Sequence, residues 1–97
     1  MQASEIAETL EEFLRRSFQI AADDPYFNRT VDLFEAGYVD SVGVVETLAF
    51  ITDTFELVVP DEAVLSDDFV SIDGIAAIIA ELLEKAAASG APLGESG

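Results

Sequence analysis

DSVGVVETLAFITDTF, residues 40–55, is the segment from which the architecture of the chain can be worked out. Its large apolar residues recur at spacings of four, three and four, which places them on one face of a helix. That face consists of Val44, Leu48, Ile51 and Phe55. Other apolar residues widen it beyond the stripe of about 100° that a surface helix usually carries; these are Val42, Val45, Ala49 and Phe50. The segment predicts a helix over 41–55 that is central to the core, reserves part of its surface for a partner, or does both.

Ser41 stands at the start of this predicted helix, a few residues after a turn at Gly37. Serine is favoured at helix N-termini because its oxygen can accept a hydrogen bond from a free backbone N–H, so Ser41 is a candidate cap. The position also suits a phosphate group, because unpaired N–H groups and the positive end of the helix dipole point outward there. The preceding turn, the acid at Asp40 and the apolar helix behind Ser41 favour a modification site over a plain cap.

A first helix is predicted over 4–18, with Ser4 as its cap. Its inward residues are expected to be Ile6, Leu10, Phe13 and Leu14. A connection over 19–40 follows, which is too long for a compact domain unless it packs or functions. We expect it to pack across the helices through its aromatic and aliphatic residues, which are Tyr26, Phe27, Val31, Leu33 and Phe34.

The second half of the chain predicts one short and one long helix. Leu57-Val58-Val59 has no obvious strand partner and is expected to be a loop, and Asp61-Glu62 opens one helical turn after Pro60. Ser71 caps a final helix over 71–88, whose inward residues are Ile72, Ile75, Ile78, Ile79, Leu82 and Leu83. Residues 89–97 are expected to form a disordered tail after a folded domain over 1–88.

The composition indicates one acidic, folded domain. The chain has 97 residues, 51% of them hydrophobic, and its formal net charge is −16. Nucleic acid is excluded as a partner because four basic residues cannot build a phosphate-binding face, whereas partners with basic patches are favoured. So highly charged a surface favours a monomer. The sequence shows no secretion signal and no apolar run long enough to span a membrane, so we expect a cytoplasmic protein.

The missing residue types exclude several kinds of catalytic and metal site. The chain contains no histidine and no cysteine, which excludes Ser-His catalysis, cysteine nucleophiles and the usual zinc sites. A calcium loop centred on Gly74 would put Phe69 and Ala80 where carboxylates are required, so no metal site is predicted. The acidic pairs Glu11-Glu12 and Asp23-Asp24 are interpreted as solvated surface, and no catalytic residue is expected.

The run DLFEAGYVDSVGVVE, residues 32–46, resembles the phosphopantetheine attachment region of acyl and peptidyl carrier proteins. In that family a Leu-Phe pair and a Gly turn precede Asp-Ser-Leu at the head of the second helix. The similarity continues through Phe55, the segment 59–62 and Phe69, and it covers about residues 4–86. Val42 stands where the family usually has Leu, which keeps an apolar contact with partner enzymes but shortens it.

The resemblance implies an all-α, four-helix bundle of the acyl carrier type, with three main helices, one short helix and a long first loop. It implies that Ser41 carries 4′-phosphopantetheine through a phosphodiester, and that Asp40 assists the phosphopantetheinyl transferase near its metal ion. Partner enzymes are expected to contact the carrier at Val42, Val45, Glu46, Val59 and Asp61. Such a protein is not an enzyme; it holds an acyl or aminoacyl intermediate as a thioester and delivers it.

The identity of the cargo is left open by the sequence. The segment 39–46 looks more like discrete carriers loaded by a separate adenylating or acyl-loading enzyme than like fatty-acid synthesis carriers. Discrete carriers of secondary metabolism are favoured over D-alanyl carriers of cell-envelope modification. From another class, the chain could be an acidic helical adaptor that is never modified and binds through Val42–Phe50. A hydrolase using Ser41 lacks a visible base.

Overall fold

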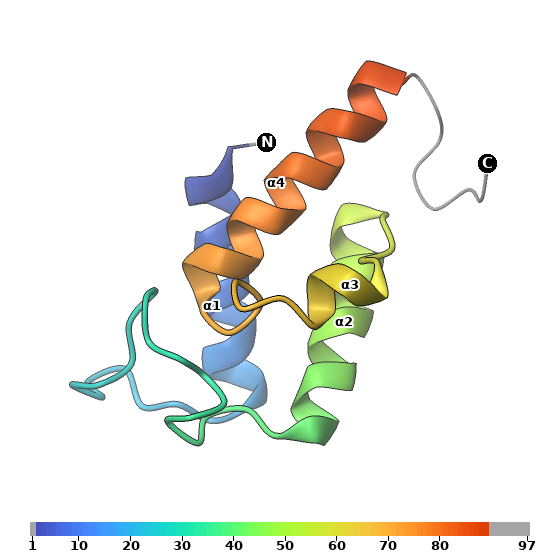
Figure 1. Ribbon diagram of the computed structural model, residues 1–97. Helices are drawn as coiled ribbons and strands as arrows, with labels where there is room; N and C mark the ends of the chain where they lie inside the picture. Colours follow the sequence, from blue (N-terminus) through green and yellow to red (C-terminus); the bar gives the residue numbers. More distant parts are fainter. Residues whose placement is uncertain (1, 90–97) are drawn as a thin grey trace.

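The computed structural model describes residues 2–89, and within them it is a small bundle of four helices without a strand (Figure 1). The helices are α1 (Ala3–Ser17), α2 (Ser41–Phe55), α3 (Asp61–Val64) and α4 (Ile72–Ser89). Both the all-α class and the bounds of α2 are confirmed, and the segment 57–59 is indeed a loop. α1 and α4 pack side by side. Of the expected disordered tail over 89–97, Ser89 is instead the last residue of α4, and residues 90–97 lie outside the described residues.

The helix starts are fixed by different caps. Ser71 caps α4 as predicted, because its Oγ accepts a hydrogen bond from the Gly74 N–H at 3.0 Å. The prediction for α1 was wrong by two residues, since Gln2 and not Ser4 is the cap. Glu5 explains the difference, because its carboxylate reaches back and accepts the Gln2 N–H at 3.2 Å. Ser4 is an exposed residue inside the first turn.

α2 buries a face slightly rotated from the predicted one. Ile51 and Phe55 are buried as expected, but Val44 and Leu48 are only partly buried. Gly43 and Thr47 take the buried positions instead. Thr47 can be buried because its hydroxyl donates to the Gly43 carbonyl oxygen at 2.7 Å, which satisfies its polar group inside the helix.

The core is formed mainly by aliphatic residues of α1 and α4. Of the predicted inward residues, Phe13, Ile78, Leu82 and Leu83 are partly buried; the others are buried, and Ala7 and Ala76 join them. Phe13 links α1 to α2 by stacking on Phe50 at a centroid distance of 4.1 Å. The fully enclosed side chains are Ile6, Leu10, Leu14, Leu33, Ile51, Phe69, Ile72, Ile75 and Ile79.

The long loop between α1 and α2 packs as predicted, with one exception. Phe27 and Leu33 are buried, and Val31 and Phe34 are partly buried against the core. Tyr26 was wrongly placed, because its side chain is 75% exposed. The Asp24 carboxylate accepts the backbone N–H of both Tyr26 and Phe27, and in this turn it is Phe27 that enters the core.

The loop is also fastened to α1 by ion pairs that centre on Glu11. The Glu11 carboxylate lies 3.0 Å from Arg29 Nε and 3.3 Å from Arg15 Nε. Arg15 also donates to the Ala21 carbonyl oxygen at 2.8 Å, and Arg29 accepts the Asp73 N–H through its carbonyl oxygen. Glu11 is therefore not a freely solvated acid, which corrects the interpretation of the Glu11-Glu12 pair.

A Glu11→Gln variant is expected to lower stability at neutral pH by less than about 1 kcal/mol, the usual limit for partly exposed ion pairs. The hydrogen bond from Arg29 is the main reason why the pKa of Glu11 lies below its ordinary value. A carboxyl whose folded pKa is lowered stabilises the fold above its unfolded pKa, and this contribution is lost as pH falls through the folded pKa. Urea denaturation at several pH values should show the Glu11→Gln defect fading in acid.

Glu12→Gln is the matched control, because Glu12 is exposed and makes no ion pair among residues 2–89. It removes the same charge from this strongly acidic chain, so its effect at neutral pH should be neutral or slightly stabilising. Equal effects of the two variants at every pH would contradict the role of Glu11.

Candidate functional site

The start of α2 is capped by Asp40, one residue before the predicted cap. Asp40 has an extended backbone, and its Oδ1 accepts the Gly43 N–H at 2.8 Å. Its carbonyl oxygen accepts the Val44 N–H at 3.0 Å. Ser41 is therefore the first residue of the helix and not its cap, which corrects the capping alternative. The sequence contains a signal for this, because Asp40 directly precedes Ser41 and Asp is also a favoured cap residue.

The hydroxyl of Ser41 has no structural role among residues 2–89. Ser41 is exposed, and no hydrogen bond within residues 2–89 involves its side chain. The backbone N–H groups of Ser41 and Val42 also have no acceptor in that part of the chain. An exposed hydroxyl therefore lies beside two free N–H donors at the positive end of a helix dipole. A phosphodiester on Ser41 fits this arrangement, since its oxygens could accept these N–H groups.

The loop before Asp40 is held in place by the Leu33 backbone. The Leu33 carbonyl oxygen accepts the N–H groups of both Tyr38 and Val39, at 2.9 and 3.0 Å. Gly37 makes the turn between them with φ +84°, a left-handed conformation that favours glycine. Val39 is buried, and its side chain lies against Gly43 in the first turn of α2.

The predicted partner-binding residues separate into exposed and buried members. Val42 and Val45 are each 66% exposed, and Glu46 is exposed beside them at helical spacing on α2. Asp61 is exposed as the first residue of α3. Val59 is only 8% exposed and belongs to the core, so its side chain offers a partner almost no surface. The alternation of the 57–59 segment puts Val58 outward instead, at 62% exposure.

The electrostatics around Ser41 are acidic at the side chains and positive only at the backbone. Asp40 precedes Ser41 and Glu46 follows on the same helix, and α2 contains no basic residue. Three of the four basic residues are engaged in ion pairs elsewhere: Arg15, Arg29 and Lys85. The α2 surface can therefore attract a partner with a basic patch.

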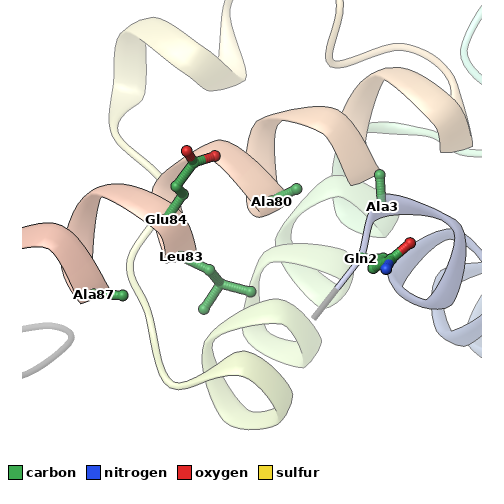
Figure 2. Close-up of a pocket in the computed structure, with 6 residues that line it drawn as sticks. All are labelled: Gln2, Ala3, Ala80, Leu83, Glu84 and Ala87. Atoms are coloured by element: carbon green, nitrogen blue, oxygen red, sulfur yellow. The ribbon is translucent and has the colours of Figure 1, made fainter.

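Two surface grooves lie apart from this site. One, of about 430 Å³, runs between the start of α1 and the second half of α4 (Figure 2). It is lined by Gln2, Ala3, Ala80, Leu83, Glu84 and Ala87. Figure 1 shows that this end of the bundle lies opposite the start of α2. The second, of about 340 Å³, lies between α3 and α4 and includes Ile78 and Lys85. Neither groove is lined by Asp40, Ser41 or Val42.

The described part of the chain shows no grouping of three or more acidic side chains that could hold a metal ion. None of its helices has the length and apolar character needed to cross a membrane. Comparison with protein-family models gives no match, and no curated protein matches the chain.

Asp40→Ala is expected to lower the free energy of unfolding by about 1 kcal/mol, because the Gly43 N–H loses its acceptor. Asp40→Asn should cost only a few tenths of a kcal/mol, since Asn is an equally good cap. Urea denaturation measures both. Asp53→Ala is the control, as Asp53 is an exposed acid of α2 whose side chain has no hydrogen bond within residues 2–89. A loss equal to that of Asp40→Ala in this control would refute the capping role.

Proposed function

We propose that this protein is a discrete carrier that holds an acyl or aminoacyl intermediate as a thioester on 4′-phosphopantetheine attached to Ser41. The observation that carries the proposal is the exposed Ser41 hydroxyl, which has no hydrogen bond within residues 2–89 and stands at the first position of a helix whose cap is a different residue. Because Asp40 does the capping, the serine oxygen is available to an incoming enzyme. The four-helix bundle is then a bundle of the acyl carrier type.

The role of each site residue follows from where its side chain lies. Ser41 would hold the phosphopantetheine group, whose thiol supplies the thioester when the group is attached. The carboxylate of Asp40 keeps one oxygen on Gly43 and is exposed, so its second oxygen is free to face the transferase and its metal ion. Val42, Val45 and Glu46 supply an apolar contact with an acidic edge for partner enzymes. On the loop before α3, Val58 takes the role expected of Val59.

A carrier needs no catalytic apparatus of its own. Its reactive thioester is carried on a long arm to active sites in other proteins, so an acid, a base or an oxyanion hole near Ser41 is not required. The absence of histidine and cysteine from the sequence agrees with this role. Its partners would be a phosphopantetheinyl transferase, an adenylating or acyl-loading enzyme and downstream acyl-processing enzymes. We place this monomeric carrier in the cytoplasm and in secondary metabolism, with a D-alanyl carrier as the second assignment.

The proposal is tested by mass spectrometry of the intact protein. Wild-type protein is incubated with coenzyme A, Mg²⁺ and a broad-specificity phosphopantetheinyl transferase, and a parallel sample lacks the transferase. A gain of one phosphopantetheine group only in the complete reaction is the expected result. An unchanged mass, with the helical circular dichroism spectrum intact, would count against the carrier and support the unmodified acidic adaptor instead.

A further inference from the structure

Tyr38 and Asp24, which lie 14 residues apart in the loop between α1 and α2, are joined by a side-chain hydrogen bond. The Tyr38 hydroxyl donates to Asp24 Oδ1 at 2.9 Å. The same oxygen accepts the backbone N–H of Tyr26 at 2.8 Å and that of Phe27 at 3.2 Å. The Tyr38 ring is partly buried and meets the Phe27 ring edge to face, with centroids 5.2 Å apart. This bond therefore ties the first part of the loop to its end.

The Asp24 side of this bond is fastened to α1. Phe27 is buried in the core, and the guanidinium group of Arg15 lies 4.7 Å from the centre of its ring. Arg15 also holds the Ala21 carbonyl oxygen and is paired with Glu11. The turn that contains Asp24 is thus attached to α1, mainly through the side chain of Arg15.

At the other end of the bond, Tyr38 is close to Ser41 along the chain. Tyr38 donates its N–H to Leu33, and the next residue, Val39, is buried against Gly43. Only Val39 and Asp40 separate Tyr38 from Ser41. A movement of the Tyr38 side chain would therefore be passed through Val39 to the first turn of α2, where Gly43 is bonded to Asp40.

The charge states of the two groups suit a bond between a phenol and a carboxylate. Hydrogen bonds, first from the Tyr26 N–H and then from Tyr38, keep the pKa of Asp24 below its ordinary value. Desolvation, followed by the bond to Asp24, raises the pKa of Tyr38 above its ordinary value. At neutral pH the donor is a neutral phenol and the acceptor a carboxylate, which is the stronger form of this bond.

We propose that the Tyr38–Asp24 hydrogen bond is a positioning brace that holds the first turn of α2, and with it the Ser41 hydroxyl, in the orientation that a modifying enzyme requires. Tyr38 acts through Val39 and does not touch the reacting oxygen, so it is a positioning residue. The inference rests on the proposed function of Ser41. It assigns a role to an aromatic hydroxyl that the local sequence gives no reason to single out.

The test compares Tyr38→Phe with a matched control in the same loop. Tyr26→Phe removes the same hydroxyl, but Tyr26 is exposed and its side chain has no hydrogen bond within residues 2–89. Amide hydrogen exchange is followed by NMR at Val39 and Gly43, with Ile79 in α4 as a reporter of global opening. In Tyr38→Phe the first two amides should exchange about threefold to tenfold faster at unchanged Ile79 exchange, whereas Tyr26→Phe should match the wild type.

Transferase kinetics provide the second readout. The kcat for modification of Tyr38→Phe should fall about threefold to tenfold, with KM changed less than about twofold, because the exposed docking residues of α2 are untouched. Asp24→Ala should show the same defect. Asp24→Asn should recover most of the wild-type kcat, since its side-chain oxygen can still accept the Tyr38 hydroxyl and both backbone N–H groups.

The outcomes separate this inference from the proposed function. A modified wild type, with Tyr38→Phe indistinguishable from it in either readout, would overturn the brace alone. Equal acceleration of exchange at Val39, Gly43 and Ile79 would also overturn it, because the bond would then serve only general stability. An Asp24→Asn variant as slow as Asp24→Ala would refute the hydrogen-bond assignment. If the wild type gains no mass at all, the proposed function fails, and positioning for a modifying enzyme fails with it.

Discussion

The Ser41→Ala variant is expected to keep its unmodified mass under conditions in which the wild-type protein gains one phosphopantetheine group. The effect should be complete, because the proposed phosphodiester needs the serine oxygen and alanine supplies none. The variant should nevertheless fold normally. The Ser41 hydroxyl has no hydrogen bond within residues 2–89, and Asp40 caps the helix in its place, so the free energy of unfolding should change by no more than about 0.5 kcal/mol. Intact-mass spectrometry and urea denaturation measure the two quantities.

Ser4→Ala is the matched control for this experiment. Ser4 is also an exposed serine in the first turn of a helix, but the residues around it do not form the attachment pattern. Its modification should equal that of the wild type. A mass gain that persists in Ser41→Ala would show that another side chain accepts the group and would remove Ser41 from its proposed role. A Ser41→Ala protein that fails to fold would contradict the capping assignment of Asp40.

The parts of the fold that could be predicted from sequence depend on local patterns. α2 has the predicted bounds because a cap residue, a long apolar segment and a following left-handed residue, Glu56, all lie close together along the chain. The loop packing was predictable because an unstructured connection of this length is uncommon in a compact domain unless it packs or functions, although Tyr26 stays exposed. The exposure of Ser41 was expected because a modification site requires an accessible hydroxyl.

The features that the sequence did not predict depend on contacts between segments that are distant along the chain. The buried face of α2 is rotated toward Gly43 and Thr47 because Phe18 and Val39 press against Gly43, and the spacing of apolar residues cannot show this. The exchange of roles between Val58 and Val59 depends on which way a short loop faces the core. The Tyr38–Asp24 bond spans 14 residues, and no local signal marks either partner.

The caps of α2 and α4 are alike, because in both the cap residue is followed three positions later by a glycine. Each helix has a glycine at its third position, and the N–H of that glycine donates to the side chain of the cap residue. The pairs are Gly43 with Asp40 and Gly74 with Ser71. The reasons for glycine differ, however. A side chain at Gly43 would meet other side chains, whereas one at Gly74 would meet the backbone of the turn before α4.

Gly74→Ala is expected to be the most destabilising of the substitutions considered, by about 3 kcal/mol, at the upper end of the usual cost of overpacking. An alanine Cβ would lie far inside van der Waals distance of the Asp68 carbonyl oxygen. Relief requires a shift of the backbone between Asp68 and α4. That backbone contains Phe69, which is buried, and Val70, whose carbonyl oxygen accepts the Leu33 N–H at 2.7 Å. The strain therefore reaches both the core and the loop that leads to Ser41.

Thermal unfolding followed by circular dichroism should show the melting temperature of Gly74→Ala lowered by roughly 10–25 °C for a domain of this size. Gly43→Ala is the matched control at the same helix position. There the nearest atoms are side-chain carbons of Val39 and Phe18 at 2.9 and 3.0 Å, which can move, and the better helix propensity of alanine offsets part of the cost. The free energy of unfolding of Gly43→Ala should therefore fall by less than about 1 kcal/mol. Because alanine is normally the better helix former, a Gly74→Ala protein as stable as the wild type would mean that the turn after Asp68 yields freely, and that Gly74 is not required by the close approach of that backbone.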